Sequence, residues 1–499
     1  MVSKKSCLIV ILIIFSIIAC IFGIIAIVYG TTFLQKQINK QLPITNTSDQ
    51  ISSWITPPVP IYLQFWLWEC VNVPDVISRG ESPLLVQHGP FTYLEKRTKQ
   101  NHVQWNTNKT VTFLESKTYI FLRNMSSDDD SLNVTMINAP IATLLFLAHR
   151  YNKYFQIILD IVAAVFKESL FVQHTVNEWI WGYEDSLLKY VKSLPLVGDL
   201  IPDDHFGYFY QQNGTDDGLY TIYTGEGNIN NLNIINKWNG ISELQYWGTK
   251  YCNQINGTDG TWFPPLSSSD HSRRLYMYST DICRSVYATY ESKSTVRGIS
   301  TDVYSIPAEV FQNGTLNPDN AGYGNLDSGI LNVSQCKENA PIIMSLPHFL
   351  YAADQYQERI DGLEPNADAH RTVLNVEPHT GLILQANKRL QINIFLQHNP
   401  YFQDLSHLDD IIIPTIWINE STTIDEQTAK DLKSKLLRYY PIVHYTGLGL
   451  TILGCIGLFL LIIIIFRLYH PKFKNEKQLI QVNINETQQT ETTPLLFNT

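Results

Sequence analysis

The stretch LIVILIIFSIIACIFGIIAIVY, residues 8–29, decides the fold because it contains no charged side chain. At about 1.5 Å per residue, a helix of this length crosses the roughly 30 Å hydrocarbon core of a bilayer. Tyr29 and Phe33 stand where a cleaved signal peptide would have small residues, and the run is longer than such a peptide's apolar region. The sequence therefore predicts an uncleaved transmembrane helix at 8–29, after an N-terminal segment at 1–7.

A second uncharged stretch, TGLGLTILGCIGLFLLIIIIF at 446–466, predicts a second transmembrane helix. Basic residues flank the two spans on the same side of the membrane, and they are Lys4, Lys5, Arg467, Lys472, Lys474 and Lys477. Because positive loops stay in the cytosol, we expect both termini to be cytosolic. Residues 30–445 then form one lumenal domain, and residues 467–499 form a cytosolic tail.

The region between the spans has the composition of a glycosylated domain of the secretory pathway. It contains nine Asn-x-Ser/Thr sequons, at Asn46, Asn108, Asn124, Asn133, Asn213, Asn256, Asn313, Asn332 and Asn419. The formal net charge of −10, despite basic cytosolic ends, makes this domain acidic. We therefore expect no nucleic-acid partner.

Four of the seven cysteines lie between the spans, at Cys70, Cys252, Cys283 and Cys336. An oxidising lumen favours disulfides, but four cysteines allow three complete pairings and the residues alone leave the choice open.

Four segments of the lumenal domain are rich in β-branched and aromatic residues with partial alternation, which predicts strands. They are 59–69, 110–123, 274–290 and 381–397. Turn-forming residues occupy 213–218 and 377–381. The pattern predicts an antiparallel sheet or barrel.

The stretch 140–171 is different, because its apolar residues recur at helical spacing. Phe155, Ile158, Leu159, Val162, Ala163 and Phe166 form one stripe, and Ile157, Ile161 and Val165 add apolar surface beyond it. Two interpretations stay open, burial between helices and a surface that faces a partner or lipid. Capping boxes predict further helix starts at Thr175 and Thr423.

Catalytic signatures are missing from the sequence. It contains no G-x-S-x-G, H-E-x-x-H, P-loop or C-x-x-C motif, and paired carboxylates such as Asp203 and Asp204 are sequence neighbours that a strand would point to opposite faces. We therefore expect no enzymatic activity, no cofactor and no metal site. Among the histidines, which titrate between secretory and lysosomal pH, His149 is the candidate pH sensor because it lies in the predicted helical region.

Five stretches match one known family in the same order along the chain. They are HTVNEWIWGYEDSLL (174–188), CNQINGTDGTWFPP (252–265), STDICRSVY (279–287), NAPIIMSLPHFLYAAD (339–354) and EPHTGLILQANKRLQINI (377–394). The chain resembles the class B scavenger receptors. The resemblance implies an α+β membrane protein with two transmembrane helices, a lumenal antiparallel β-barrel, an apical helical bundle and a hydrophobic tunnel.

The resemblance also implies a receptor that binds lumenal proteins or lipids, and the family's lysosomal member carries a lysosomal hydrolase. Its partner-binding apex corresponds to candidate residues His149, Lys153, Ile157, Ile158 and Ile161. Cys283 and Cys336 match family positions that are joined by a disulfide. Many relatives have a further cysteine pair between them, where this chain has none.

The tail contains ETTPLLFNT, in which Glu491 stands four residues before Leu495 and Leu496. This spacing is typical of an acidic dileucine signal read by cytosolic clathrin adaptors, and it indicates endosomes and lysosomes. Other functions stay open: lipid transfer through the tunnel, a surface phagocytic receptor, and a two-span ion channel, against which the lack of ionisable residues in the spans argues. The sequence also leaves open whether the chain forms homo-oligomers.

Overall fold

A computed structural model describes residues 4–48, 51–99, 103–149, 153–194, 198, 203–266 and 271–489. The chain divides into two compact units. One unit comprises Met1–Ile38 and Leu432–Thr499, and the other comprises Asn39–Asp431. Each unit is described by itself.

The first unit contains two long helices, α1 (Lys4–Gln41) and α11 (Tyr439–Gln489). Segments Cys7–Gln41 and Tyr439–Arg467 are long and apolar enough to cross a membrane. Each contains one of the two predicted spans. The helices extend beyond the apolar runs because, once a helix has begun, each further residue adds a backbone hydrogen bond.

Small residues let α1 and α11 approach closely. A Cβ added at Gly454 would lie 2.5 Å from Cys20 Sγ, and one added at Gly23 would lie 2.3 Å from Thr451 Oγ1. The sulfur atoms of Cys20 and Cys455 are 3.7 Å apart. Small residues at such contacts are typical of membrane helices, where packing between backbones replaces the hydrophobic effect.

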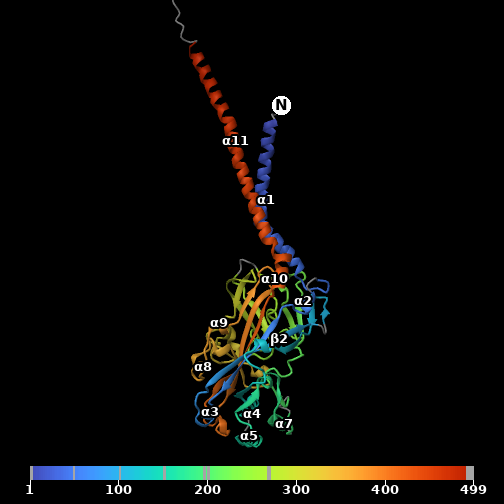
Figure 1. The fold of residues 1–499 in the computed structure, drawn as a ribbon, viewed down its shortest axis with the longest axis vertical. Coiled ribbons are helices and arrows are strands. Elements are labelled where there is room, and N and C mark those ends of the chain that lie inside the picture. The colour runs from blue at the N-terminus through green and yellow to red at the C-terminus, as the bar shows by residue number, and fades with distance from the viewer. Residues whose placement is uncertain are drawn as a thin grey trace, which may run out of the picture. The chain divides into compact units, whose positions relative to one another are not determined.

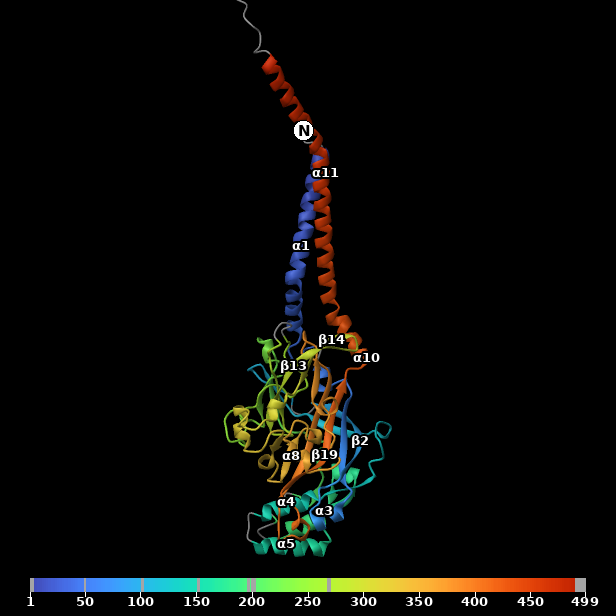
Figure 2. The ribbon, with the colours of Figure 1, turned by 90° about the vertical axis from the view of Figure 1, so that its left-hand side faces the viewer.

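The second unit is built on a large antiparallel sheet (Figures 1 and 2). Its main path runs β12-β13-β14-β17-β18-β19-β1-β2-β5, and β15 and β16 join it beside β18. The strands are β1 (Ile61–Cys70), β2 (Leu85–Thr98), β5 (Ser116–Phe121), β12 (Leu275–Ser279), β13 (Arg284–Val296), β14 (Ile299–Ser305), β15 (Ile330–Asn332), β16 (Ile342–Ser345), β17 (Val373–Val376), β18 (Ile383–Leu396) and β19 (Ile411–Thr423).

The central strand β1 shows why these residues form a sheet. Its side chains alternate between buried and half-buried up to a register shift between Phe65 and Leu67, as expected when successive residues point to opposite faces. It pairs with β19 on one side and with β2 on the other, so that Ile61 faces Thr422 across the ladder. The first and last strands of the domain are therefore neighbours.

The sheet curls around an interior cavity but does not close by strand pairing. Within the described residues, no ladder joins the two edge strands β5 and β12. A loop bridges them instead: Lys117 of β5 forms an isolated bridge with Thr215, and Asp217 accepts a hydrogen bond from Thr280 beside β12. The predicted barrel is thus a curled sheet with a seam.

Smaller sheets flank the large one. A four-stranded sheet contains β3 (Gln104–Trp105), β4 (Thr110–Phe113), β10 (Tyr220–Tyr223) and β11 (Ile235–Trp238). Two further pairs are β6 (Asn133–Ile137) with β7 (Phe171–Thr175), and β8 (Tyr183–Glu184) with β9 (His205–Phe206).

Helices α3, α4, α5 and α7 gather at one end of the second unit, and α2 lies at the other end (Figure 1). Leu145, Leu159, Leu187 and Val191 of α4, α5 and α7 share a core with the ends of the long strands. This is the predicted helical bundle. The helices are α2 (Ile51–Ile55), α3 (Val73–Arg79), α4 (Ala139–Ala148), α5 (Lys153–Phe166), α6 (Val176–Trp181), α7 (Ser186–Lys192), α8 (Asp354–Glu358), α9 (Ala367–His370) and α10 (Glu426–Leu432).

Some elements differ from the sequence-based expectation. The predicted strand region 110–123 divides into β4 and β5, which belong to different sheets. The capping box at Thr175 is present, but the helix expected from Thr423 begins later, because the Asp425 carboxylate accepts from the N–H groups of Gln427 and Thr428. Thr423 instead ends β19.

Candidate functional site

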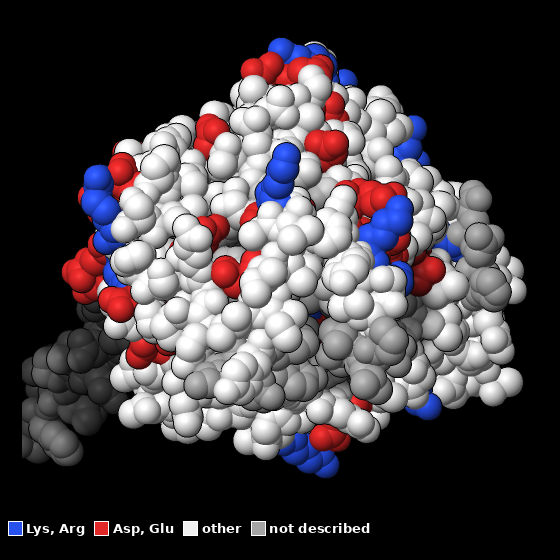
Figure 3. Space-filling model, turned by 90° about the horizontal axis from the view of Figure 1, so that it is seen from below, with Lys and Arg blue, Asp and Glu red and all other residues white. Residues whose placement is uncertain are grey.

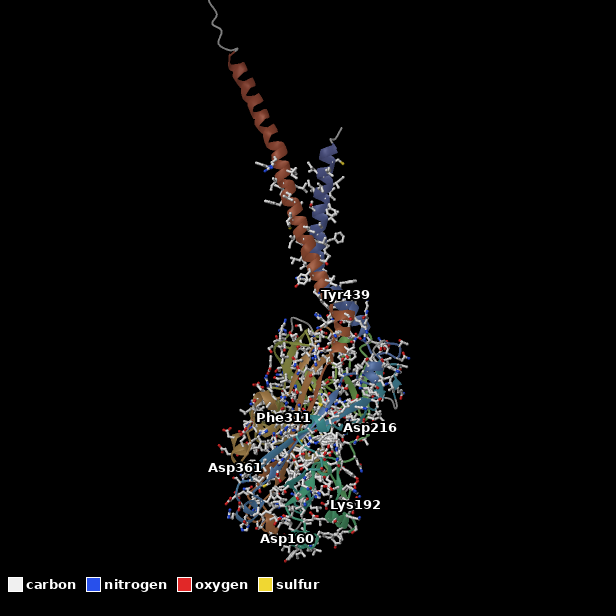
Figure 4. The ribbon with its side chains drawn as sticks, in the orientation of Figure 1. Asp160, Lys192, Asp216, Phe311, Asp361 and Tyr439 are labelled. Atoms are coloured by element: carbon white, nitrogen blue, oxygen red, sulfur yellow. A yellow bond between two sulfur atoms is a disulfide. The ribbon has the colours of Figure 1, made fainter. Side chains whose placement is uncertain are left out.

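Helix α5 is held at the end of the domain by its buried face. Leu159 and Ala163 lie in the core, and the Phe166 ring packs at 5.1 Å from that of Tyr190 on α7. Asp160, which Figure 4 places at this end, accepts a hydrogen bond from the Gln403 N–H at 3.1 Å. These contacts fix which side of α5 faces water.

The opposite side of α5 is apolar and exposed. We call Tyr154, Ile157, Ile158, Ile161 and Val165 the α5 apolar face. Ile158 is 56% exposed, Ile161 57% and Val165 73%. Their spacing places them along one side of the helix. Figure 3, which views this end of the domain, shows mostly uncharged residues with scattered Lys, Arg, Asp and Glu between them.

The structure separates the residues of the predicted stripe. Leu159 and Ala163 are buried, whereas Ile158, which is also a predicted partner residue, lies on the exposed face. An apolar residue between two apolar neighbours gives no signal of its own direction, because both sides of α5 are apolar. The structure brings together three predicted partner residues, Ile157, Ile158 and Ile161.

Of the other two predicted partner residues, one follows α4 and the other has a side chain outside the described residues. His149 follows α4 directly, is exposed, and donates its backbone N–H to Leu145 O. The side chain of Lys153 lies outside the described residues.

Inside the curled sheet lies a cavity of about 160 Å³, the central cavity. Apolar side chains such as Leu63, Leu390 and Ile418 line part of it. Its volume is well below the roughly 300–1,000 Å³ of typical small-molecule sites. A second hollow of about 290 Å³ shares Lys117, Asp217 and Thr280 with it, so the two adjoin at the seam between β5 and β12.

Charged side chains also line the central cavity. Arg97 contacts three carboxylates, with Nε 2.5 Å from Glu95, Nη2 3.1 Å from Glu420 and Nη1 3.7 Å from Glu115. Lys99 pairs with Glu115, and Lys388 pairs with Glu420 at 3.0 Å. We call these six residues the Arg97 network.

Charge pairing keeps Glu115 and Glu420 ionised, whereas burial outweighs the pairing with Arg97 at Glu95 and raises the pKa of that carboxyl. Burial acts to raise the pKa of Glu115, but Lys99 and Arg97 lower it to about 2. Burial likewise opposes ionisation of Glu420, and Lys388 and Arg97 still lower its pKa. No local sequence pattern predicts this network, since Arg97, Lys388 and Glu420 are far apart along the chain.

Most of the predicted glycosylation sites are accessible. Asn46, Asn108, Asn124, Asn133 and Asn213 are exposed, and Asn256, Asn313 and Asn332 are half-buried. Asn419 is 6% exposed and its Nδ2 donates to Gln64 Oε1 at 3.0 Å. A glycan at Asn419 would require this side chain to leave its hydrogen bond.

The cysteines are now assigned. A disulfide joins Cys283 and Cys336, the pair that the resemblance implied. Cys70 and Cys252 are buried thiols within the described residues, and no bridge joins them. The tail residues Glu491, Leu495 and Leu496 lie outside the described residues.

Comparison with known proteins places the chain in a family. The family model described as the CD36 family matches residues 14–465, nearly the whole chain. The chain belongs to the CD36 family. It is 40% identical to lysosome membrane protein 2 of Rattus norvegicus over 410 residues, covering 80% of this chain and 83% of that protein.

Further CD36-family relatives agree. Lysosome membrane protein 2 of Homo sapiens is 38% identical over 411 residues, covering 81% of this chain and 83% of the relative. Scavenger receptor class B member 1 of Bos taurus is 31% identical over 438 residues, covering 87% and 84%. These homologues are class B scavenger receptors, which supports a membrane receptor in place of an enzyme.

Proposed function

We propose that this chain is a two-span receptor of endosomal and lysosomal membranes with both termini in the cytosol. Its lumenal domain binds a protein ligand, such as a lysosomal hydrolase to be sorted. The observation that carries the proposal is the α5 apolar face, whose members include Ile158 and Ile161. Contiguous apolar surface on a soluble domain marks an interaction site, because its exposure to water is unfavourable until a partner covers it.

The identity to lysosome membrane proteins favours the lysosomal over the surface form of the receptor. The dileucine sequence in the tail supports the same location.

The ligand-binding proposal is tested with the full-length protein by affinity purification at neutral and acidic pH, followed by mass spectrometry of bound proteins. Ile158→Asp with Ile161→Asp should reduce capture of the lumenal ligand by about tenfold or more, since truncated apolar hot spots cost about 2 kcal/mol or more. Leu316→Asp is the matched control, because Leu316 is also apolar and 65% exposed but lies outside α5. Undiminished capture by the Ile158/Ile161 variant would reject the α5 apolar face as the binding surface.

We propose His149, which follows α4 directly, as the group that makes ligand release depend on pH, because histidine is the side chain type that ordinarily changes charge between secretory and lysosomal pH. His149→Gln should retain capture at acidic pH. Release of the ligand in acid by this variant would mean that another group senses pH.

The sorting proposal concerns Glu491, Leu495 and Leu496 as a signal for clathrin adaptors. Leu495→Ala with Leu496→Ala should move the protein from lysosomes to the cell surface, as measured by surface biotinylation. If the variant stays in lysosomes, these residues are not the sorting signal.

Lipid transfer is the second candidate function, favoured by the central cavity and the adjoining hollow at the seam. Because the central cavity is small, a lipid would require the seam to widen. Leu390→Trp, which narrows the cavity with a larger side chain, should reduce lipid uptake strongly and spare protein binding. Lipid uptake that survives this change would reject transfer through the cavity.

A further inference from the structure

A second apolar pocket lies away from the central cavity and the α5 apolar face. It has a volume of about 300 Å³, and its walls include Phe146 of α4, Tyr356 of α8 and Phe395 of β18. Arg359 and Asp410 supply polar groups. Asn332, the acceptor of a predicted glycan, also lines this pocket. We call it the Asn332 pocket.

The conformation of Asn332 leaves its amide nitrogen available. Its Oδ1 accepts the Ser334 N–H at 2.9 Å, forming a turn that fixes the side chain. No described residue accepts a hydrogen bond from its Nδ2. At Asn419, in contrast, Nδ2 is held by Gln64. Nδ2 is the atom to which an N-linked glycan is attached, so Asn332 can carry a glycan without breaking a contact.

We infer that the Asn332 pocket is filled by the first N-acetylglucosamine residues of a glycan on Asn332. This inference rests on the lumenal topology of the proposed function. The pocket thus holds part of the chain's own modification, which packs α4 and α8 against the ends of the sheet.

The chemistry of the pocket suits this occupant. A pyranose ring has an apolar face of C–H groups that packs on aromatic rings, and its hydroxyl and acetamide groups lie around the edge. Tyr356 donates its hydroxyl to Asp327 at 3.1 Å, which fixes its ring in the wall. The Arg359 guanidinium, which donates to the Asp410 backbone carbonyl, adds a donor-rich edge for sugar oxygens. The volume is at the lower end of the range for small-molecule sites, about 300 Å³, as expected for one or two sugar rings.

The test compares the accessibility of glycans at two sites of the full-length glycoprotein. Asn313 is the matched comparator, because it is also half-buried and its Oδ1 accepts the backbone N–H of Thr315 in the same kind of turn, but it does not line the pocket. An endoglycosidase that cuts between the two core N-acetylglucosamine residues is applied under native conditions, and site-specific release is followed by mass spectrometry. Release at Asn332 should be about tenfold slower than at Asn313, which corresponds to ~1.4 kcal/mol in favour of the bound glycan.

Two variants separate the glycan from the pocket wall. Tyr356→Ala should bring the release rate at Asn332 to that at Asn313. Ser334→Ala removes the sequon and leaves Asn332 in place, and the hydroxyl lost has no hydrogen-bond partner among the described residues. The thermal destabilisation caused by Tyr356→Ala should be smaller in the Ser334→Ala background, because the coupled partner is already gone.

Equal release rates at Asn332 and Asn313 in the unaltered protein, or additive effects of the two variants, would overturn the inference. If glycans are found at the exposed sequons but not at Asn332, the inference about the pocket is wrong and the proposed lumenal topology still holds. A protein without glycans at any sequon would overturn the lumenal topology as well. An acyl chain or a partner side chain found in the pocket of the glycosylated protein would replace the proposed occupant.

Discussion

Gly322 stands beside the buried thiol of Cys252 within the stretch NAGYGNLDSG (320–329). A Cβ at Gly322 would lie 2.8 Å from Cys252 Sγ. Gly322→Cys should therefore form a disulfide with Cys252 and stabilise the Asn39–Asp431 unit by up to about 4 kcal/mol for a loop of roughly 70 residues. The disulfide is detected by mass spectrometry, because neither Cys252 nor the new cysteine is then modified by an alkylating reagent.

Thr249 limits the gain, since the added Cβ would also lie 2.4 Å from its Oγ1. Gly322→Ala is the control that has the same crowding and no sulfur. A melting temperature for Gly322→Cys no higher than that of Gly322→Ala would contradict the prediction.

His348 and His370 make stability depend on pH. Their rings stack at 4.0 Å, both side chains are 6% exposed, and each Nδ1 accepts a backbone N–H, from Glu364 and Asn366 respectively. Burial, and then the proximity of His370, lower the pKa of His348 to about 3. Burial, and then Arg389, lower the pKa of His370 to about 4.

The neutral rings belong to the folded state, so the unfolded chain binds protons first as the pH falls. The free energy of unfolding keeps its full value above about pH 6.5. Below that pH it declines, by up to about 2 kcal/mol for each ring at pH 5. Urea denaturation at pH 7.5 and 5 measures this loss. His370→Asn retains an acceptor near the Nδ1 position and should halve the decline; an unchanged decline would assign the pH dependence to other groups.

At the scale of elements, the two spans form a pair that can be tested through their cysteines. Cys20 and Cys455 have sulfur atoms 3.7 Å apart. In native membranes a membrane-permeant oxidant should link them within one chain, as detected by mass spectrometry of the joined peptides. Gly454→Leu should abolish the link, because even a Cβ there would meet Cys20 Sγ at 2.5 Å. Efficient linking in Gly454→Leu would show that the spans do not pack through this contact.

Helix α5 shows what an apolar pattern leaves undecided. Its sequence predicts a helix with excess apolar surface, which the structure confirms. Only the packing against α4 and α7 determines that Leu159 faces inward and Ile158 outward. Strand boundaries depend on neighbours in the same way, since residues 110–121 contribute to two different sheets.

At the scale of the whole molecule, the Arg97 network joins residues from the beginning and the end of the Asn39–Asp431 unit. Removing Arg97 leaves Glu95, Glu115 and Glu420 in a buried site without their shared cation. Arg97→Ala should destabilise the domain by about 3–5 kcal/mol, as for other broken buried ion pairs. Arg97→Lys should recover part of this loss, and chemical denaturation of both variants measures it. A loss below about 1 kcal/mol, typical of surface pairs, would contradict a buried network.

The sequence by itself determined the two spans, the antiparallel sheet, the sequons and the resemblance to a family, because these depend on composition, local periodicity and motif order along the chain. Tertiary structure alone decided the seam between β5 and β12, the Arg97 network, the histidine pair and the two sides of α5. Each of these joins residues distant in sequence: Arg97 and Glu420, for example, meet only because β2 and β19 flank β1. Local sequence specifies which elements form, and contacts across the fold specify where each side chain points.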